Sequence, residues 1–313
     1  MENTKIVITG GAGFVGKRLI NLLTKKGFKN ITVVDTFETK FENVKYIKTD
    51  FADEKIIKPI LEKTDIFFHL AAMIGVDNCR NHPDLVRQVN YTNTKQLINW
   101  ALDKGVKRIV FTSSSEVYGN SKDIPYKEDG ELEPVSVYGQ AKVDIENYLL
   151  EAQKKSKMSI GISRLFNVYG PGQKIDFVVS IFINAALSNK PLQIFGTGEQ
   201  TRTFTYVDDV ANGLLKLGLY NKTPYEIVNL GSKEEYSITN LAKMILDLIP
   251  ESTSQIDYVQ YGEEGTRTSN YEIVKRVPSI EKANRILDFE AKTTLREGLL
   301  SAIDYLKSIN LLQ

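Results

Sequence analysis

Residues 9–16 read TGGAGFVG, and this stretch decides the fold of the chain. An apolar run at residues 5–9 (KIVIT) predicts a buried strand before it, and residues 17–26 predict a helix after it. Gly11, Gly13 and Gly16 form the pattern G-x-G-x-x-G between the two. Glycines at these positions let the chain turn tightly, let the backbone approach a pyrophosphate and let the helix pack on the sheet. The stretch therefore predicts a dinucleotide-binding turn.

A carboxylate stands where the second predicted strand ends. Residues 31–35 (ITVVD) predict that strand, and Asp35 closes it about 20 residues after the glycine pattern. A carboxylate at this place accepts hydrogen bonds from the ribose hydroxyls of a dinucleotide and repels a 2′-phosphate. The expected cofactor is therefore NAD rather than NADP.

Other candidates for the cofactor site lie at the ends of neighbouring strands. Asp50 and Phe51 follow the third predicted strand, residues 44–49, at the edge of the sheet where an adenine would lie. Ala71 and Ala72 follow the fourth, residues 65–70, and their small side chains allow a close approach of the cofactor. Each pair fits ordinary packing equally well on chemistry alone. The full set of cofactor-binding candidates is Gly10, Gly13, Phe14, Val15, Gly16, Asp35, Asp50, Phe51, Ala71, Ala72, Asn90, Tyr138 and Lys142.

Strand-like and helical patterns alternate through the first 230 residues. Further strands are expected at 108–112, 159–165 and 226–230, with helices near 84–104 and 138–155. This alternation predicts an α/β fold with a Rossmann-type, doubly wound, mostly parallel sheet. We expect residues 1–165 plus about 204–231 to form the NAD-binding domain. We expect about 166–203 plus 232–313 to form a smaller, discontinuous α/β lobe that binds the substrate.

A second motif suggests chemistry on a hydroxyl group. Tyr138 and Lys142 form Y-x-x-x-K at the start of a predicted helix, and this spacing places both side chains on one face. An ordinary tyrosine has a pKa of about 10, and we expect the ammonium of Lys142 to lower the pKa of Tyr138. Ser113, Ser114 and Ser115 follow the fifth strand, at the edge where open α/β sheets bind ligands. The motif alone also arises by chance in helices, but together with the glycine pattern and the serines it predicts an oxidoreductase.

The overall composition argues against several other classes. The chain is 42% hydrophobic and 25% charged, and its net charge of +1 does not favour nucleic acid or a membrane surface as a partner. The single cysteine, Cys79, permits no internal disulfide and fits a reducing cytoplasm. The two histidines show no zinc-site spacing, so no metal is expected. The chain shows no signal peptide and no apolar run of the roughly 20 residues that span a bilayer, so we expect a cytoplasmic protein.

Seven stretches together resemble the extended short-chain dehydrogenases/reductases that act on nucleotide sugars, and they span nearly the whole chain. They are TGGAGFVG (9–16), HLAA (69–72), SSSEVYG (113–119), YGQAK (138–142), RLFNVYGPG (164–172), FGTGEQTRTFTYVDDV (195–210) and RVPSIEKANRILDFE (276–290). The resemblance implies NAD as cofactor and a nucleotide-diphosphate sugar as substrate. It implies Tyr138 as the catalytic base, Lys142 as its partner and Ser114 as the third member.

The resemblance also implies which residues hold the substrate. The candidates are Ser114, Ser115, Asn167, Arg202 and Arg267. Arginine offers planar, bidentate donors that suit a diphosphate. Either arginine fits a surface ion pair as well, and Asn167 fits a turn cap before Gly170. Aromatic residues that can stack on a base, or belong to the core, are Phe177, Phe195 and Tyr206.

The shared first step of the resembling enzymes is oxidation of the sugar, usually at C4. Their dehydratases carry Asp-Glu after the catalytic Ser or Thr, whereas this chain carries Ser115-Glu116, which counts against loss of water. Glu116 is then a candidate second base. Two outcomes need no further group: a 4-epimerase re-reduces the keto sugar, and a 4-dehydrogenase releases it, as in enzymes that act on a GDP-linked heptose.

Three alternatives stay open. Ser-Glu together with Arg202 resembles nucleotide-glucuronate decarboxylases, although the segment between Glu116 and Tyr138 lacks their usual insertion. A 4,6-dehydratase is a further possibility. A non-catalytic NAD-binding regulator on the same fold is more remote, because such a protein would be expected to lose Tyr138 or Lys142. Finally, the resemblance implies a homodimer in which the helices near 84–104 and 138–155 form a four-helix bundle.

Overall fold

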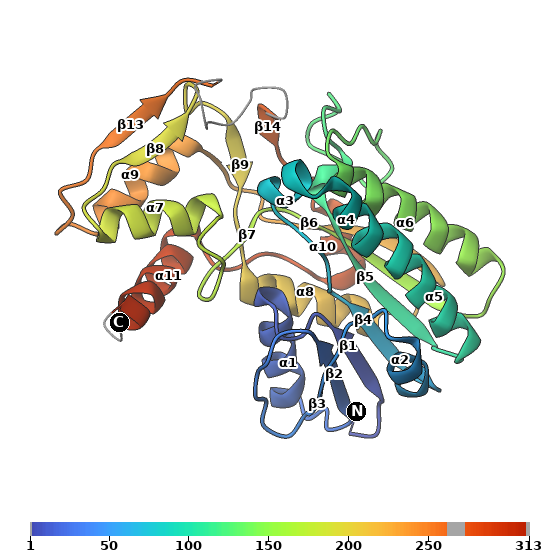
Figure 1. Ribbon diagram of the computed structural model, residues 1–313. Helices are drawn as coiled ribbons and strands as arrows, with labels where there is room; N and C mark the ends of the chain where they lie inside the picture. The colour runs from blue at the N-terminus through green and yellow to red at the C-terminus, as the bar shows by residue number, and fades with distance from the viewer. Residues whose placement is uncertain (1, 262–272, 311–313) are drawn as a thin grey trace.

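The computed structural model describes residues 2–261 and 273–310. A seven-stranded parallel sheet lies at its centre, in the order β11-β6-β5-β4-β1-β2-β3 (Figure 1). The predicted α/β class with a doubly wound parallel sheet is therefore confirmed. The strands are β1 Ile6–Thr9, β2 Ile31–Asp35, β3 Lys45–Lys48, β4 Ile66–His69, β5 Arg108–Ser114, β6 Ser159–Leu165 and β11 Tyr225–Leu230.

Helices cover both faces of this sheet. The alternation of side chains along β1 shows why, since Ile6 and Ile8 pack in one apolar cluster and Val7 packs in the other. The first cluster holds α1 (Phe14–Lys25), α8 (Val207–Leu219) and α10 (Glu281–Leu287). The second holds α2 (Glu54–Leu61), α5 (Thr94–Asp103) and α6 (Val137–Lys154).

A second body of chain packs around its own apolar cluster, beyond one end of the sheet (Figure 1). Its helices are α7 (Val178–Leu187), α9 (Ile238–Leu248) and α11 (Leu295–Asn310). Its strands are β7 (Val168–Tyr169), β8 (Leu192–Phe195), β9 (Thr201–Thr203), β10 (Thr205–Tyr206), β12 (Glu235–Ser237), β13 (Ile256–Val259) and β14 (Lys275–Arg276). We call this body the second lobe. Residues 281–289 depart from it, because Ala283, Leu287 and Phe289 pack in the cluster that also holds β1 and α1.

A helix lies where one was expected near 84–104, but it contains a π-helical turn that the sequence did not predict. Two α-helices, α4 (Pro83–Arg87) and α5, are separated by a π-helical turn at Gln88–Asn93. The Thr94 hydroxyl donates to the carbonyl of Val89, five residues back. A short helix, α3 (Val76–Asn81), and a 3₁₀ turn at Ser115–Val117 complete the elements. Hydrophobic periodicity cannot show such a turn, because one extra residue hardly disturbs the pattern.

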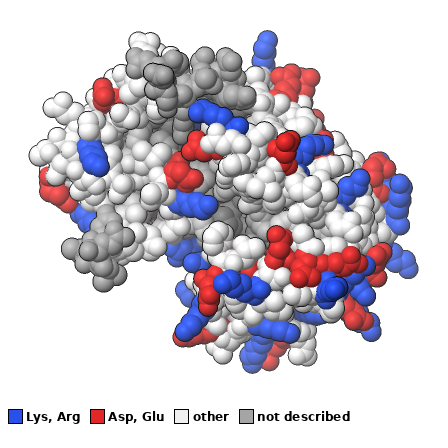
Figure 2. All heavy atoms as spheres, in the orientation of Figure 1, with Lys and Arg blue, Asp and Glu red and all other residues white. Residues whose placement is uncertain are grey.

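The surface carries both signs of charge. Figure 2 shows Lys and Arg side chains interspersed with Asp and Glu over the face in view, as the net charge of +1 leads one to expect. Within residues 2–261 and 273–310, no helix has both the length and the apolar character that a membrane span requires.

Candidate active site

The turn between β1 and α1 leaves room for a cofactor because its glycines have no side chains. Gly10 has φ +75°, and a Cβ there would lie 2.5 Å from the backbone nitrogen of Ala71. A Cβ on Gly16 would lie 2.4 Å from the carbonyl oxygen of Gly10. Helix α1 starts after Gly13 with no side-chain cap and no acidic residue in its first turn. The N–H groups of that turn, including those of Phe14 and Val15, are therefore open to an anion such as a pyrophosphate.

Asp35 lies beside this turn, at the end of β2. Its Oδ2 accepts a hydrogen bond of 2.9 Å from Ala12 N, and its Oδ1 accepts one of 3.1 Å from Phe37 N. The carboxylate is thus fixed next to the glycine turn, where it can meet a ribose. Asp50 turns its carboxylate to Ala52 N, and the Phe51 ring is buried in the core. Phe51 can therefore face an adenine only with its backbone.

The loop after β4 closes the same site from the other side. It contains Ala71 and Ala72, and Asn90 reaches it from the π-helical turn. Asn90, buried to 1% exposure, accepts from Met73 N at 3.0 Å and donates to Met73 O at 2.8 Å. Asn90 therefore holds the backbone of the loop that faces Gly10, rather than pointing at a ligand itself.

The three predicted catalytic residues come together at the carboxyl ends of the strands. Ser114 ends β5, and Tyr138 and Lys142 lie in the first two turns of α6. Tyr138 and Ser114 are joined by a side-chain hydrogen bond. The ammonium nitrogen of Lys142 lies 5.5 Å from the centre of the Tyr138 ring and donates to Thr112 O at 2.8 Å. Ser113 and Ser115 are both buried to 3% exposure, so Ser114 is the serine of the three that is accessible.

The protonation of this pair differs from the prediction. Burial raises the pKa of Tyr138 above its ordinary value, the charge of Glu116 raises it further, and the hydrogen bond with Ser114 opposes both. Burial lowers the pKa of Lys142 to about 7, against the charge of Glu146. The pKa of Tyr138 is therefore raised, whereas we expected Lys142 to lower it. Desolvation is the largest influence on this pKa, and the same desolvation favours the uncharged form of Lys142.

Glu116, a catalytic candidate from the sequence, lies close enough to Tyr138 for its charge to act on it. Its Oε2 accepts a hydrogen bond of 2.8 Å from Ser136, whose hydroxyl in turn caps α6 by accepting from Gly139 N at 2.9 Å. The carboxylate is thus tied to the first turn of the helix that carries Tyr138. Cys79, half-buried on α3, also lies beside them, since Glu116 raises the pKa of its thiol and Tyr138 N donates to it. No pattern in the sequence pointed to Cys79 as a neighbour of the site.

The second lobe contributes polar groups from two strands and a loop. Arg202 on β9 lies in register with Arg276 on β14, and both cations lower the pKa of Tyr126, which burial raises. Within the described part of the chain, Arg276 Nε, Thr203 Oγ1 and Asn167 Oδ1 are buried atoms that lack a hydrogen-bond partner. Buried polar atoms are usually bonded, so the open Nε of Arg276, in register with Arg202, fits an anionic ligand.

Arg276 was missed as a site residue, although it lies in one of the stretches that carried the resemblance. Only the pairing of β9 with β14 brings it beside Arg202. Arg267 lies outside the described residues. Of the aromatic candidates, Tyr206 packs against Tyr169 with ring centres 5.9 Å apart, Phe195 lies 6.2 Å from Tyr261, and Phe177 immediately precedes α7.

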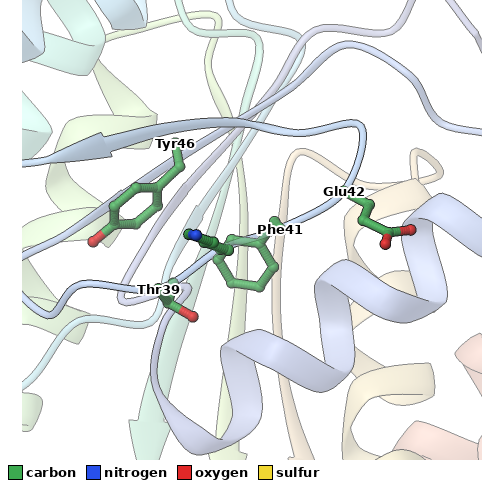
Figure 3. A pocket seen from close by; sticks show the side chains of 5 residues that line it. Thr39, Phe41, Glu42 and Tyr46 are labelled. Carbon is green, nitrogen blue, oxygen red and sulfur yellow. The ribbon is translucent and has the colours of Figure 1, made fainter.

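A pocket elsewhere does not belong to this site. Thr39, Lys40, Phe41, Glu42 and Tyr46 line it, in the connection that follows Asp35 (Figure 3). None of them comes from the strand ends that carry the catalytic candidates. The pocket is a hollow between the β2–β3 connection and neighbouring chain, and it brings no group with acid, base or nucleophile chemistry to the Tyr138 hydroxyl.

A family model and several curated proteins are similar to this chain. The model of the "NAD dependent epimerase/dehydratase family" matches residues 6–231. Among curated proteins, the chain is 33% identical to UDP-glucuronic acid decarboxylase 4 of Arabidopsis thaliana, over 94% of this chain and 67% of that one. It is 31% identical to UDP-N-acetyl-alpha-D-glucosaminuronate decarboxylase of Bacillus cytotoxicus, over 97% and 98% of the two chains.

Solved structures are similar over the whole chain. MoeE5 in complex with UDP-glucuronic acid and NAD matches with a TM-score of 0.89 and 28% identity, over 97% of this chain and 99% of that one. The UDP-glucose 4-epimerase of Thermotoga maritima matches with a TM-score of 0.88 and 28% identity, over 98% and 99%. The names of these proteins share nucleotide sugars, the MoeE5 complex also holds NAD, and decarboxylases and an epimerase are both among them.

Proposed function

The chain belongs to the NAD-dependent epimerase/dehydratase family, and from this premise we propose that it oxidises the C4 hydroxyl of a nucleotide-diphosphate sugar. The 4-keto sugar is then either re-reduced on its other face, as in a 4-epimerase, or released, as in a 4-dehydrogenase. Family membership establishes an NAD-dependent enzyme acting on nucleotide sugars. The position of oxidation and the product are the proposal.

One observation carries the proposal: Tyr138, Ser114 and Lys142 meet at the strand ends beside the glycine turn. Tyr138 and Ser114 share a hydrogen bond, so a sugar hydroxyl can replace either partner and bond to both oxygens. Gly10 and Gly16 leave the space that a dinucleotide backbone needs. Asp35 is fixed where it can accept from ribose hydroxyls, which favours NAD over NADP.

NAD, when bound, supplies the acceptor for the hydrogen that leaves C4. The chain does the rest. Tyr138 takes the proton of the C4 hydroxyl, and Ser114 holds that hydroxyl in line. Lys142, anchored on Thr112 O, places a cation beside the phenolate form of Tyr138, which becomes the neutral phenol when it takes the proton.

We place the diphosphate of the substrate in the second lobe, beside buried polar atoms that lack a hydrogen-bond partner. We assign Arg202 and Asn167, as expected from the sequence, together with Arg276 and Thr203. An Arg guanidinium donates to two phosphate oxygens at once, and the open hydroxyl of Thr203 adds a donor. Arg267 remains a sequence-based candidate. Ser115 is buried and has no ionisable group, so it offers no acid for the loss of water.

A decarboxylase acting on a nucleotide-linked uronic acid is the second candidate. It is favoured by the decarboxylase relatives at 31–33% identity and by Glu116 beside Tyr138. C4 oxidation comes first in this reaction as well, because a 4-keto group takes up the electron pair left at C5 when the carboxylate attached to C5 departs as carbon dioxide. A carboxylate on the sugar could also form ion pairs with Arg202 and Arg276, which lie in register on paired strands.

Incubation with a panel of UDP-, GDP-, CDP- and dTDP-sugars that includes UDP-glucuronic acid separates these outcomes. Mass spectrometry and NMR of the sugar report two hydrogens lost for a dehydrogenase and an unchanged mass with inverted C4 for an epimerase. Loss of carbon dioxide reports the decarboxylase. Loss of water, or no conversion of any sugar, would contradict the proposal.

A further inference from the structure

A buried ion pair lies directly behind the catalytic residues. Glu146 comes one helical turn after Lys142 on α6, and Arg164 lies on β6, the neighbour of the strand that ends at Ser114. Arg164 Nη2 donates to Glu146 Oε2 at 2.7 Å, and the two side chains are 2% and 4% exposed. Removing two charges from water is costly, and their attraction does not guarantee a net gain in stability. A pair in this position therefore calls for another explanation.

The pair is the centre of a continuous polar network. Ser113 Oγ donates to Glu146 Oε1, and this bond joins the end of β5 to the helix that carries Tyr138. On the other side, Arg164 Nη1 donates to the Tyr118 hydroxyl at 2.8 Å, and Tyr118 donates to Asn229 Oδ1 at 2.7 Å.

The network continues to the chain that leads into the second lobe. Asn229 Nδ2 donates to the carbonyls of Tyr126 at 2.9 Å and Ser279 at 3.3 Å. Ser279 lies three residues after Arg276, and Tyr126 N donates to Val277 O at 2.8 Å. One network thus contacts the strand of Ser114, the helix of Tyr138 and the segment of Arg276.

We propose that Glu146 is a positioning residue for the oxidation site, acting through Ser113 and Arg164. Its Oε1 holds the end of β5 against α6 through Ser113, and its Oε2 holds Arg164 of the neighbouring β6, which sets the distance between Ser114 and Tyr138. Its charge acts on Lys142 along the same helix face. This inference rests on the proposed function, since it concerns the same three catalytic residues.

Electrostatics agree with this geometry. Glu146 opposes the effect of burial on Lys142 and so raises the pKa of that ammonium. The charged and titratable groups around Lys142 are Tyr138 and Glu146 on its own helix and His69 on β4, and His69 is neutral because burial lowers its pKa to about 3. Neutralising Glu146 should therefore let Lys142 lose its proton at a lower pH.

The decisive variant is Glu146→Gln, which keeps the shape of the side chain and removes its charge. Activity is followed as hydride transfer to NAD, with UDP-glucose and UDP-glucuronic acid as probes. We expect kcat to fall about tenfold to a hundredfold, as for a small misplacement of reacting groups, with KM within about threefold of wild type. The alkaline limb of the kcat–pH profile should move to lower pH by about one unit. Asp144→Asn is the matched control, because it removes an exposed ion pair with Arg87 from the same helix.

A purely structural role gives a different result. In that case, kcat per folded molecule and the pH limb of Glu146→Gln match wild type, and the proposal is overturned. Because a lone buried charge destabilises a protein more than loss of the whole pair, Glu146→Gln/Arg164→Gln is measured alongside. A double variant that regains wild-type kcat and pH profile also overturns the proposal.

Ser113→Ala carries the test if neither charge variant folds. It cuts the contact with β5 and leaves the ion pair intact, so we expect a lower kcat with an unchanged KM, and a wild-type kcat would refute the positioning role. If wild-type protein converts neither probe, the variants are measured with the sugar of the UDP-, GDP-, CDP- and dTDP-linked panel that it does convert. Failure of the proposed function looks different, because wild-type protein would then convert no sugar of that panel.

Discussion

Tyr138 is the residue on which the proposed chemistry depends most. It lies at the accessible end of a helix face with Lys142 behind it and Ser114 bonded to its hydroxyl. Tyr138→Phe removes the base and should lower kcat about 10²–10⁴-fold. Steady-state turnover of a nucleotide sugar measures this loss. Tyr148→Phe is the control, since Tyr148 lies on the same helix but bonds Asn99 instead, and it should keep wild-type turnover.

His69 makes the pH dependence of stability testable. Both ring nitrogens are bonded: Thr9 Oγ1 lies 2.6 Å from Nδ1 and Thr94 Oγ1 lies 3.1 Å from Nε2. The Thr94 hydroxyl donates its proton to Val89 O, so it can only accept from His69. Nε2 of His69 therefore donates to Thr94, and Nδ1 accepts from Thr9. Burial lowers the pKa of His69 from 6.5 to about 3.

The sign of the effect follows from proton counts. Between pH 6.5 and about 3 the unfolded chain protonates His69 and the folded chain does not, so the free energy of unfolding falls as the pH falls. The slope from this one group is at most about 1.4 kcal/mol per pH unit. Urea unfolding at several pH values should show a flatter dependence for His69→Gln. His82→Gln, at the other and exposed histidine, should keep the wild-type slope, and equal slopes in all three proteins would contradict this role.

The sequence could predict residues whose motif carries the chemistry within a few positions. Tyr138, Lys142 and Ser114 are of this kind, as are the glycines and Asp35. Arg276 and Asn229 could not be found this way, because their neighbours come from strands distant in the chain. The pKa directions of Tyr138 and Lys142 also escaped prediction, since burial is a property of the whole fold.

Among the elements, the π-helical turn at Gln88–Asn93 matters most for the cofactor site. It turns Asn90 inward to hold both backbone groups of Met73. Asn90→Ala leaves these groups without partners, and each lost bond costs about 1 kcal/mol. We expect NADH affinity, measured by fluorescence titration, to fall about tenfold.

The same turn provides a control for that prediction. Asn93 accepts from Gln88 at its surface, so Asn93→Ala should bind NADH as wild type does. If Asn90→Ala also keeps wild-type affinity, the loop after β4 does not depend on this clamp.

Strands and long helices were predictable because their side chains alternate or repeat with a clear period. The expected strand at 226–230 corresponds to β11, which pairs with β6 in the main sheet. The helix expected at 138–155 corresponds to α6, whose cap is Ser136. The π-helical turn escaped because it depends on Thr94 and Asn90 finding buried partners in β4 and the loop that follows it.

At the scale of the whole molecule, the proposed site lies where two bodies of chain meet. Arg18 of α1 joins them by donating to Pro171 O at 3.0 Å. The domain boundaries expected from the sequence stay a prediction, as do the homodimer and the cytoplasmic location. The helices expected at the dimer interface carry polar contacts on their outer face, such as the Arg87–Asp144 pair.

Binding of the cofactor should stabilise the whole molecule. A ligand at 100 times its Kd adds about 2.7 kcal/mol to the free energy of unfolding. We expect NAD to raise Tm by about 5 °C in a thermal scan, and NADP to raise it less, because Asp35 repels a 2′-phosphate. An equal shift with both cofactors would contradict the assigned role of Asp35.

The central claim is that the chain removes hydrogen from C4 of a nucleotide sugar. The most direct measurement uses nucleotide sugars deuterated at C4, UDP-glucose, UDP-glucuronic acid and a GDP-hexose among them, in a single turnover with NAD-loaded protein. Mass spectrometry then locates the label. The account predicts deuterium in the reduced cofactor, with the transfer lost in Tyr138→Phe. Because re-reduction returns the deuterium to C4, the reaction is quenched at early times, and a product that forms without deuterium in the cofactor at any of them would contradict the account.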